Sequence, residues 1–598
     1  MNPVNSSFQQ YWRLLLDYLR PQKGTVMLLT GLLLSSVGLQ LANPQIVRYF
    51  LDTAEAGDEL GKLLGAAALF TGVALVRQAI HVTAMYVGEN VAWTATNLLR
   101  ADLALHCLKL DMTFHKKWKP GELIERVDGD VNQLANFFSQ LVVRLGANLL
   151  LTVGVLALLA WQDWRIGLSI TAVAVIGVSA LSWLNKRTVP RWQALREADA
   201  RLFGFLEEWL NGVEEIRSSG AKPYIMRQLY QAMRERWHRI LAAMRIQVLV
   251  IDLPIGVFAL AYVAAHVLGN LLYRRGGDSE NGMTIGALYL IFYYLDLLRG
   301  PLWEILRQVE DLQRASASIN RITELRQIQP TIHDGPEDAF PSGALAVSFE
   351  DVTFHYEDDA ETDVLQHLTF TLKPGTVLGL LGRTGSGKST LTKLLFRFYD
   401  PSVGAIRLGS GDGPMLDLRQ ARLADLRQHI GMVTQEVQLF QASVRQNLTL
   451  FDDTIPDELI KKVVEQVGLG NWLTARPLGL DTSLEVGGSG LSAGEAQLMA
   501  FARVFLVNPG LVILDEASSR LDPATEQRIE TAVDRLLADR TVIIIAHRLS
   551  TVQRADEIMI LEDGRIAEHG PRAELARNPG ARFYRLLHAS RGLEEAMA

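Results

Sequence analysis

A glycine-rich stretch in the second half of the chain constrains the fold more than any other feature of the sequence. Residues 378–391 read LGLLGRTGSGKSTL, which matches G-x-x-x-x-G-K-[ST] at every fixed position. An apolar run precedes the glycines and a helical pattern follows them, so the stretch predicts a strand, a tight loop and a helix. The backbone N–H groups of such a loop and the positive end of the helix together bind phosphate groups. A turn without a ligand is the simpler alternative, which the complete set of fixed residues disfavours.

The side chains of this loop predict a nucleotide site with a metal ion. Lys388 would reach the β- and γ-phosphates, and the Ser389 hydroxyl would bind Mg²⁺, which prefers oxygen ligands. The residues expected to hold the phosphates are Gly382, Thr384, Gly385, Ser386, Gly387, Lys388, Ser389 and Thr390.

Length and composition place part of the chain in lipid. The chain has 598 residues, of which 48% are hydrophobic and only 21% are charged. This length predicts more than one domain, and the composition is apolar for a soluble protein. The formal net charge of −7 gives no support to a nucleic-acid partner, which usually requires a basic face. A single cysteine, Cys107, excludes an internal disulfide.

Six apolar stretches in the first half of the chain predict transmembrane helices. Residues 8–20, which precede them, are expected to form a helix in the membrane surface. An even number of spans puts both termini on one side of the membrane. The predicted spans are residues 25–42, 63–86, 141–161, 166–184, 248–272 and 285–306.

Among the loops that join the predicted spans, those after the second and fourth spans carry most of the lysine and arginine residues. An excess of these residues marks the cytoplasmic side of a membrane protein. We therefore expect a multi-pass protein of the cell (inner or plasma) membrane with cytoplasmic termini. Helical periodicity in residues 91–110 and 184–246 predicts helices that continue beyond the bilayer. Each loop has a break, at residues 118–121 and at residues 218–223.

Several ionisable residues fall inside the predicted spans. Such residues usually face a helix-bundle interior or an aqueous cavity and are candidates for a cargo site. We place Arg77 first because it lies deepest in its span. For Asp252, Asp296 and Arg299, a position at the membrane interface explains the charge equally well. The remaining two residues are His81 and Arg144.

The composition predicts a transmembrane domain over residues 1–328, a linker over 329–344 and an α/β domain over 345–590. Within the last, residues 511–516 and 541–547 are apolar runs that end in polar residues, as in buried parallel strands whose carboxyl ends meet a ligand. Asp515 would hold the Mg²⁺ shell through water, and Glu516 would polarise the attacking water. His547 would contact the γ-phosphate.

Residues 485–497 read EVGGSGLSAGEAQ and lie between the phosphate loop and the Asp-Glu strand. They resemble the L-S-G-G-Q signature of ATP-binding cassette proteins. With its six spans ahead of one such domain, nearly the whole chain resembles an exporter-type half-transporter. The resemblance implies that Tyr356 stacks on adenine and that Gln435 touches Mg²⁺. It also implies that Ser492 and Gly494 face the γ-phosphate of an ATP bound to a second subunit.

The resemblance further implies an all-α membrane domain with long cytoplasmic extensions, fused to an α/β P-loop ATPase. Its coupling helices would lie near residues 112–120 and 219–226, and a turn at residues 298–302 would lie near the end of the sixth span. ATP binding and hydrolysis would drive alternating access and export an amphipathic drug, lipid or peptide-like substrate. An ATP-gated channel or regulator with the same fold is the alternative.

Two departures from the signature bear on the partner. Ala493 adds a methyl group where backbone should approach phosphate, and Glu495 brings an anion near an anion. The site completed by this signature should be weak, whereas this chain keeps Glu516 and His547. The pattern resembles one half of a heterodimeric exporter, and a homodimer that tolerates both changes is the alternative.

Overall fold

The chain folds into two compact units in the computed structural model. The first holds Met1–Leu108 and Pro120–Ile328, and the second holds Lys109–Lys119 and Gln329–Ala598. The structure describes residues 16–57, 59–139, 145–275, 284–336, 340–357, 362–411, 413–485, 491–515, 523–546 and 551–597.

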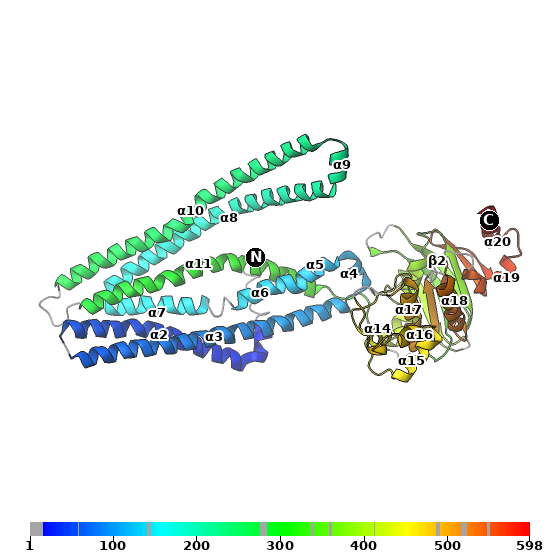
Figure 1. Cartoon of the computed structure of the whole chain (residues 1–598), viewed down its shortest axis with the longest axis horizontal. Helices are drawn as coiled ribbons and strands as arrows, with labels where there is room; N and C mark the ends of the chain where they lie inside the picture. The colour runs from blue at the N-terminus through cyan, green and yellow to red at the C-terminus, as the bar shows by residue number, and fades with distance from the viewer. Residues whose placement is uncertain are drawn as a thin grey trace. The chain divides into compact units, whose positions relative to one another are not determined.

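The described residues of the first unit form helices joined by short turns (Figure 1). Its helices are η1 (Arg20–Gln22), α2 (Lys23–Glu55), α3 (Leu60–Lys109), α5 (Pro120–Ile124), the π-helical turn η2 (Glu125–Gly129), α6 (Asp130–Ser139), α7 (Gly146–Gln162), α8 (Trp164–Asn211), α9 (Val213–Ser218), α10 (Lys222–Arg275) and α11 (Ile285–Gln327).

Three of these helices are far longer than a bilayer requires. The helices α3, α8 and α10 contain 50, 48 and 54 residues. At a rise of 1.5 Å per residue they are roughly 70–80 Å long, against about 30 Å for the hydrocarbon layer. The predicted helical extensions beyond the membrane are therefore confirmed. The predicted breaks also appear, before Pro120 and between α9 and α10.

Four helices in the described part of the chain are long and apolar enough to cross a membrane: Leu16–Glu55, Leu60–Lys109, Trp164–Asn211 and Lys222–Leu271. The third predicted span corresponds to α7, which is shorter at 17 residues. The sixth lies in the first half of α11. The count of six spans stays a prediction. Residues 8–15 of the predicted surface helix lie outside the described residues.

Two local expectations differ from the structure. Around the second predicted coupling segment, the short helix is α9, and residues 219–221 form the turn before α10 (Figure 1). The predicted turn at residues 298–302 is wrong, because α11 continues through Pro301. A proline can stay inside a helix when packing compensates for the lost hydrogen bond. Pro301 itself is buried, and Leu298, three residues before it on the helix, is only 1% exposed.

The second unit contains two β-sheets. Strands β1 (Ala346–Phe354), β2 (Leu365–Leu372), β4 (Val403–Gly409) and β5 (Met415–Asp417) form an antiparallel sheet in the order β2-β1-β4-β5. The second sheet has the order β10-β9-β3-β8-β7-β6. All its neighbours are parallel except the edge pair β9 and β10. Its strands are β3 (Val377–Gly382), β6 (Ile430–Val433), β7 (Leu511–Asp515), β8 (Thr541–Ile545), β9 (Glu557–Glu562) and β10 (Arg565–Pro571).

The central strands of the six-stranded sheet are buried on both faces, as parallel strands usually are. All five residues of β8 are buried. Helices and short turns of the second unit, some of which cover this sheet, are α4 (Met112–Lys117), α12 (Lys388–Leu395), η5 (Leu418–Gln420), α13 (Leu423–His429), α14 (Val444–Thr449), α15 (Asp457–Gln466), α16 (Gly470–Thr474), η6 (Gly479–Asp481), α17 (Ala493–Val507), α18 (Pro523–Leu537), η8 (Thr551–Arg554), α19 (Arg572–Leu575) and α20 (Arg582–Met597).

Part of the predicted linker is bound to the nucleotide domain. The side chain of Arg397 is almost fully buried and donates to the carbonyls of His333 (2.9 Å) and Ala421 (3.3 Å). The backbone N–H of Gly335 also donates to the carbonyl of Ala421. These contacts hold His333 and Gly335 of the linker against Arg397, which follows α12, and against Ala421, which lies between η5 and α13.

Candidate functional site

The glycine-rich loop connects β3 to α12, as the sequence predicts. Gly385 and Gly387 have φ angles of +87° and +101°, a region that side chains with a Cβ rarely adopt. A Cβ at Gly387 would also lie 2.5 Å from Leu365 Cδ2. The loop therefore needs glycine at this point for backbone conformation and for space. It turns the chain so that the N-terminus of α12 follows directly.

The loop has the features of a phosphate cradle. The Lys388 side chain is buried and its Nζ donates to the carbonyls of Gly382 (2.7 Å) and Arg383 (2.9 Å). Ser386 Oγ is one of the buried polar atoms of the described chain that have no hydrogen-bond partner. Because a buried hydroxyl without a partner is costly, this atom fits a loop that takes an anionic ligand.

The six-stranded sheet brings the glycine-rich loop, Asp515 and Gln435 to the carboxyl ends of its parallel strands. Ile545 is in register with Leu380 on one side and with Asp515 on the other. Leu380 lies just before the glycine-rich loop, so Asp515 is two strands away from the start of that loop. On the next strand, Val433 pairs with Leu514, and Gln435 follows it as an exposed residue. Carboxyl ends of parallel strands meet the ligand at such an edge.

Two catalytic predictions lie outside the described residues. Glu516 directly follows β7, and His547 follows the described Ala546 after β8. Their roles stay predictions from the sequence.

Tyr356 lies beside the start of α12. Its hydroxyl is 3.1 Å from Thr390 Oγ1, and its ring contacts Phe354 and Tyr399 edge to face at 5.0 and 5.3 Å between centroids. The half-buried ring thus lies next to the phosphate loop. This position is consistent with the predicted stacking on a nucleotide base.

The altered signature segment begins a helix that caps itself. Ser492 Oγ accepts from the Glu495 N–H (3.2 Å), and Glu495 Oε2 accepts from the Ser492 N–H (2.7 Å). This reciprocal pair is a capping box, which satisfies backbone donors at a helix N-terminus. The Glu495 carboxylate therefore lies at the N-terminus of α17, while Ser492 and Ala493 are exposed and Gly494 is buried.

Sequence reasoning gave no role to Arg503, which joins α17 to the loop of Gln435. Its guanidinium donates to the carbonyls of Asn447 (2.7 Å) and Gln438 (3.0 Å). Burial lowers the pKa of Arg503, and these two carbonyls compensate for its lost hydration. The only signal in the sequence was an arginine in an otherwise apolar helical run.

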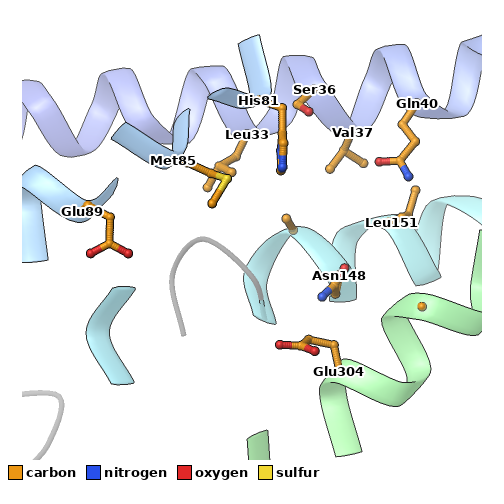
Figure 2. A pocket seen from close by; sticks show the side chains of 12 residues that line it. Leu33, Ser36, Val37, Gln40, His81, Met85, Glu89, Asn148, Leu151 and Glu304 are labelled. Carbon is orange, nitrogen blue, oxygen red and sulfur yellow. The ribbon is translucent and has the colours of Figure 1, made fainter. Parts of the chain in front are cut away.

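A cavity of about 440 Å³ lies between α2, α3, α7 and α11 of the first unit (Figure 2). This volume is within the range of small-molecule sites. Figure 2 shows Gln40, His81, Asn148 and Glu304 around one space, with Glu89 at its side. The lining combines apolar and polar side chains from Leu33, Ser36, Val37, Gln40, His81, Met85, Glu89, Ala147, Asn148, Leu151, Gly300 and Glu304.

Among the described ionisable residues predicted for a cargo site, one lines this cavity. His81 lines it, whereas Arg77 lies one helical turn earlier on α3 and Asp252 lies on α10. Arg144 is outside the described residues, and Asp296 and Arg299 do not line this cavity. Glu304 is in the sixth predicted span, so its charge was a signal that the sequence reasoning missed.

The chain is similar to known proteins along nearly its whole length. The model of the ABC transporter transmembrane region matches residues 26–302, and the ABC transporter model matches residues 365–519. An ATP-dependent lipid A-core flippase of Pseudomonas fluorescens is 30% identical over 99% of this chain and 97% of its own. A putative multidrug export ATP-binding/permease protein of Bacillus subtilis is 30% identical over 94% and 96%.

The solved structure of a bacterial Atm1-family ABC exporter with ATP bound has the same fold. Its TM-score is 0.72 at 23% identity, over 96% of this chain and 98% of that chain.

Proposed function

Because this chain belongs to the ABC transporter family, we propose that it is a half-transporter that exports an amphipathic substrate from the cytoplasm or the inner leaflet. ATP binding and hydrolysis drive the transport. The observation that carries this proposal is the combination, in one chain, of long apolar helices with an intact phosphate loop beside the ends of β7 and β8.

Hydrolysis depends on groups gathered at the edge of the six-stranded sheet. Lys388 and the loop N–H groups hold the phosphates, and Tyr356 stacks on the base. Glu516 polarises the attacking water, and His547 contacts the γ-phosphate. The oxygen-bearing side chains of Ser389, Gln435 and Asp515 suit Mg²⁺, which would neutralise charge on the phosphates.

The test is transport by the full chain in inverted membrane vesicles, with and without a second half-transporter encoded beside it. We expect ATP-dependent accumulation of substrate, which an ATP-gated channel would not produce because it allows only passive leak. The variant Glu516→Gln should keep ATP binding and lose nearly all turnover. Unchanged turnover in this variant would remove Glu516 from its role as general base. Vesicles of the opposite orientation should not respond to external ATP if the nucleotide domain is cytoplasmic.

The partner that fits this chain best is a different half-transporter. Each ATP in such a dimer lies between the phosphate loop of one subunit and the signature of the other. In this chain the Glu495 carboxylate already occupies the N-terminus of α17, where a phosphate of the partner's nucleotide would approach. Repulsion between these anions weakens the site that this signature completes. A partner with an intact signature would complete a competent site on this chain's own phosphate loop.

The cavity of Figure 2 is the cargo site that we propose within this function. Its apolar residues suit the body of an amphipath, and Glu89 and Glu304 favour a cationic or hydrogen-bond-donating head group. We expect Glu304→Gln to reduce ATP-driven accumulation of the fluorescent cation ethidium, while Glu304→Asp retains most of it. Asp252→Asn is the matched control, since Asp252 carries the same charge on α10 and does not line the cavity. Equal effects of Glu304→Gln and Asp252→Asn would contradict this assignment.

A further inference from the structure

A short segment between two helices of the membrane unit packs with the nucleotide-binding unit instead. Residues Lys109–Lys119 belong to the second unit, although α3 precedes them and α5 follows them. Asp111 holds this segment in place, because its Oδ2 accepts from both the N–H and the hydroxyl of Thr331 at 2.7 Å. Phe114 is buried and stacks on Trp118 with ring centroids 5.8 Å apart. The segment is thus tied to Thr331 at its start, and its central residue Phe114 is buried.

From this segment, Lys116 reaches the aromatic ring that lies beside the phosphate loop. Its Nζ is 4.4 Å from the centroid of the Tyr356 ring, well inside the distance at which a cation is attracted by an aromatic face. Lys393 of α12 also approaches this ring, but at 5.9 Å. The ring is therefore positioned by α12, by its aromatic neighbours and by a cation that comes from α4.

We propose that Lys116 is a positioning residue for nucleotide binding, which links the orientation of Tyr356 to the position of α4. The inference rests on the proposed function, in which Tyr356 stacks on the base. Any shift of α4 relative to Tyr356 moves this cation over the ring, so the stacking surface offered to the base changes. Coupling between two sites is reciprocal, so a bound base also favours one position of α4.

The contact is specific to one of two neighbouring lysines. Lys117 is the next residue of the same short helix, has the same charge and is exposed. Among the described residues, the lysines with a cation–π contact to Tyr356 are Lys116 and Lys393, and Lys117 has none. The chain therefore provides its own control for the loss of a positive charge at this place.

The test compares ATP with inorganic tripolyphosphate by titration calorimetry on the purified full-length protein. An exposed cation–π contact is worth about 0.5–1 kcal/mol, so Lys116→Ala should weaken ATP binding about two- to fivefold. Tripolyphosphate has no base and its binding should not change. Lys116→Arg should restore ATP binding, Lys116→Gln should not, and Lys117→Ala should bind as the wild type does. Equal weakening of ATP and tripolyphosphate would show a general charge effect and would overturn the proposal.

A double-mutant cycle separates this inference from the proposed function. In a Tyr356→Leu background, Lys116→Ala should have no further effect on ATP binding, because the ring is already gone. If Tyr356→Leu alone leaves ATP binding unchanged, the base-stacking role of Tyr356 fails. If Tyr356→Leu weakens binding but Lys116→Ala does not, or if the two effects add, only the role of Lys116 fails.

Discussion

Gly387 shows how a single residue decides whether the phosphate loop can form. Its φ of +101° is in the left-handed region, and the space where a Cβ would stand is occupied by Leu365. Gly375 is a useful contrast, since its φ is +76° but a Cβ there would meet nothing within 4 Å. The two glycines share the conformational requirement and differ in the steric one.

We expect Gly375→Ala to destabilise the nucleotide domain by about 1–2 kcal/mol, the cost of a left-handed conformation for a residue with a Cβ. Gly387→Ala should cost about 1–3 kcal/mol more because of overpacking against Leu365. Thermal unfolding of both variants measures the difference. ATP binding should be lost in Gly387→Ala and kept in Gly375→Ala. Identical melting temperatures for the two variants would contradict the steric argument.

At the scale of elements, ion pairs join helices that the sequence separates. Arg321 on α11 pairs with Asp130 at the start of α6, where the carboxylate is almost fully buried. Its Nε donates to Asp130 Oδ2 at 2.8 Å. By contrast, Arg201 on α8 and Glu235 on α10 form a pair whose side chains are 62% and 43% exposed. A buried charge depends on its partner much more than an exposed one does.

Removing Arg321 should therefore be far more harmful than removing Arg201. Arg321→Ala leaves the buried Asp130 carboxylate without its partner, and we expect a loss of about 3–5 kcal/mol. Arg201→Ala should change stability by less than about 1 kcal/mol. Melting temperatures in detergent check both values. The prediction fails if the two substitutions lower the melting temperature equally.

The contact between Asp111 and Thr331, which also joins two segments far apart in the chain, should make the stability of the protein depend on pH. Burial acts to raise the pKa of Asp111, but hydrogen bonds from Thr331, Phe114 and Thr113 outweigh it and hold the pKa below its ordinary value of 3.8. Because the folded pKa is depressed, the contact stabilises the protein fully above the unfolded pKa. That stabilisation is lost as the pH falls through the lower folded pKa.

We therefore expect Asp111→Asn to be less stable than the wild type at neutral pH. The difference in melting temperature between them should shrink as the pH falls below about 3.8, where the Asp111 carboxyl of the unfolded chain becomes protonated, and should be lost below the lower folded pKa. Melting curves of both proteins over this pH range provide the measurement. A difference that stays constant with pH would mean that the charge of Asp111 does not contribute.

For the whole molecule, the decisive question is which second chain completes the nucleotide site. The self-capped N-terminus of α17 limits what this chain offers to a partner's ATP. Its own phosphate loop has no comparable defect among the described residues. This asymmetry within one chain is the structural basis for expecting a heterodimer.

We expect Ala493→Gly combined with Glu495→Gln to strengthen ATP-driven pairing of the chain with itself. Glutamine keeps the capping box but removes the anion, and glycine removes the methyl group. The measurement is ATPase activity and ATP-dependent dimerisation of the purified chain without a partner, in which the double variant should exceed the wild type. Ser492→Ala should abolish the gain. Strong ATPase activity of the unmodified lone chain would favour a homodimer.

Short-range patterns in the sequence were sufficient for the phosphate loop, the helical extensions and the ordered strands, because each depends on neighbouring residues and their periodicity. They also identified the segment of Asp515, whereas the resemblance to ATP-binding cassette proteins indicated Gln435 and Tyr356. Parallel strand pairing brings the segments of Asp515 and Gln435 together, while Tyr356 follows β1 of the other sheet and meets α12 through Thr390. Pattern reasoning failed at Pro301, where packing outweighs the preference of proline to end a helix. Sequence patterns also did not identify the residues of the membrane cavity, except for His81, because side chains from four separate helices form this cavity.

The sequence by itself determined that this chain has apolar helices and a phosphate-binding α/β domain, because hydrophobic periodicity and glycine spacing are local properties. Only the tertiary structure decided that Lys116 lies over Tyr356 and that Arg321 neutralises Asp130. Both contacts join residues that are far apart in the chain. Packing of whole elements therefore determines which of many possible charged partners actually meet.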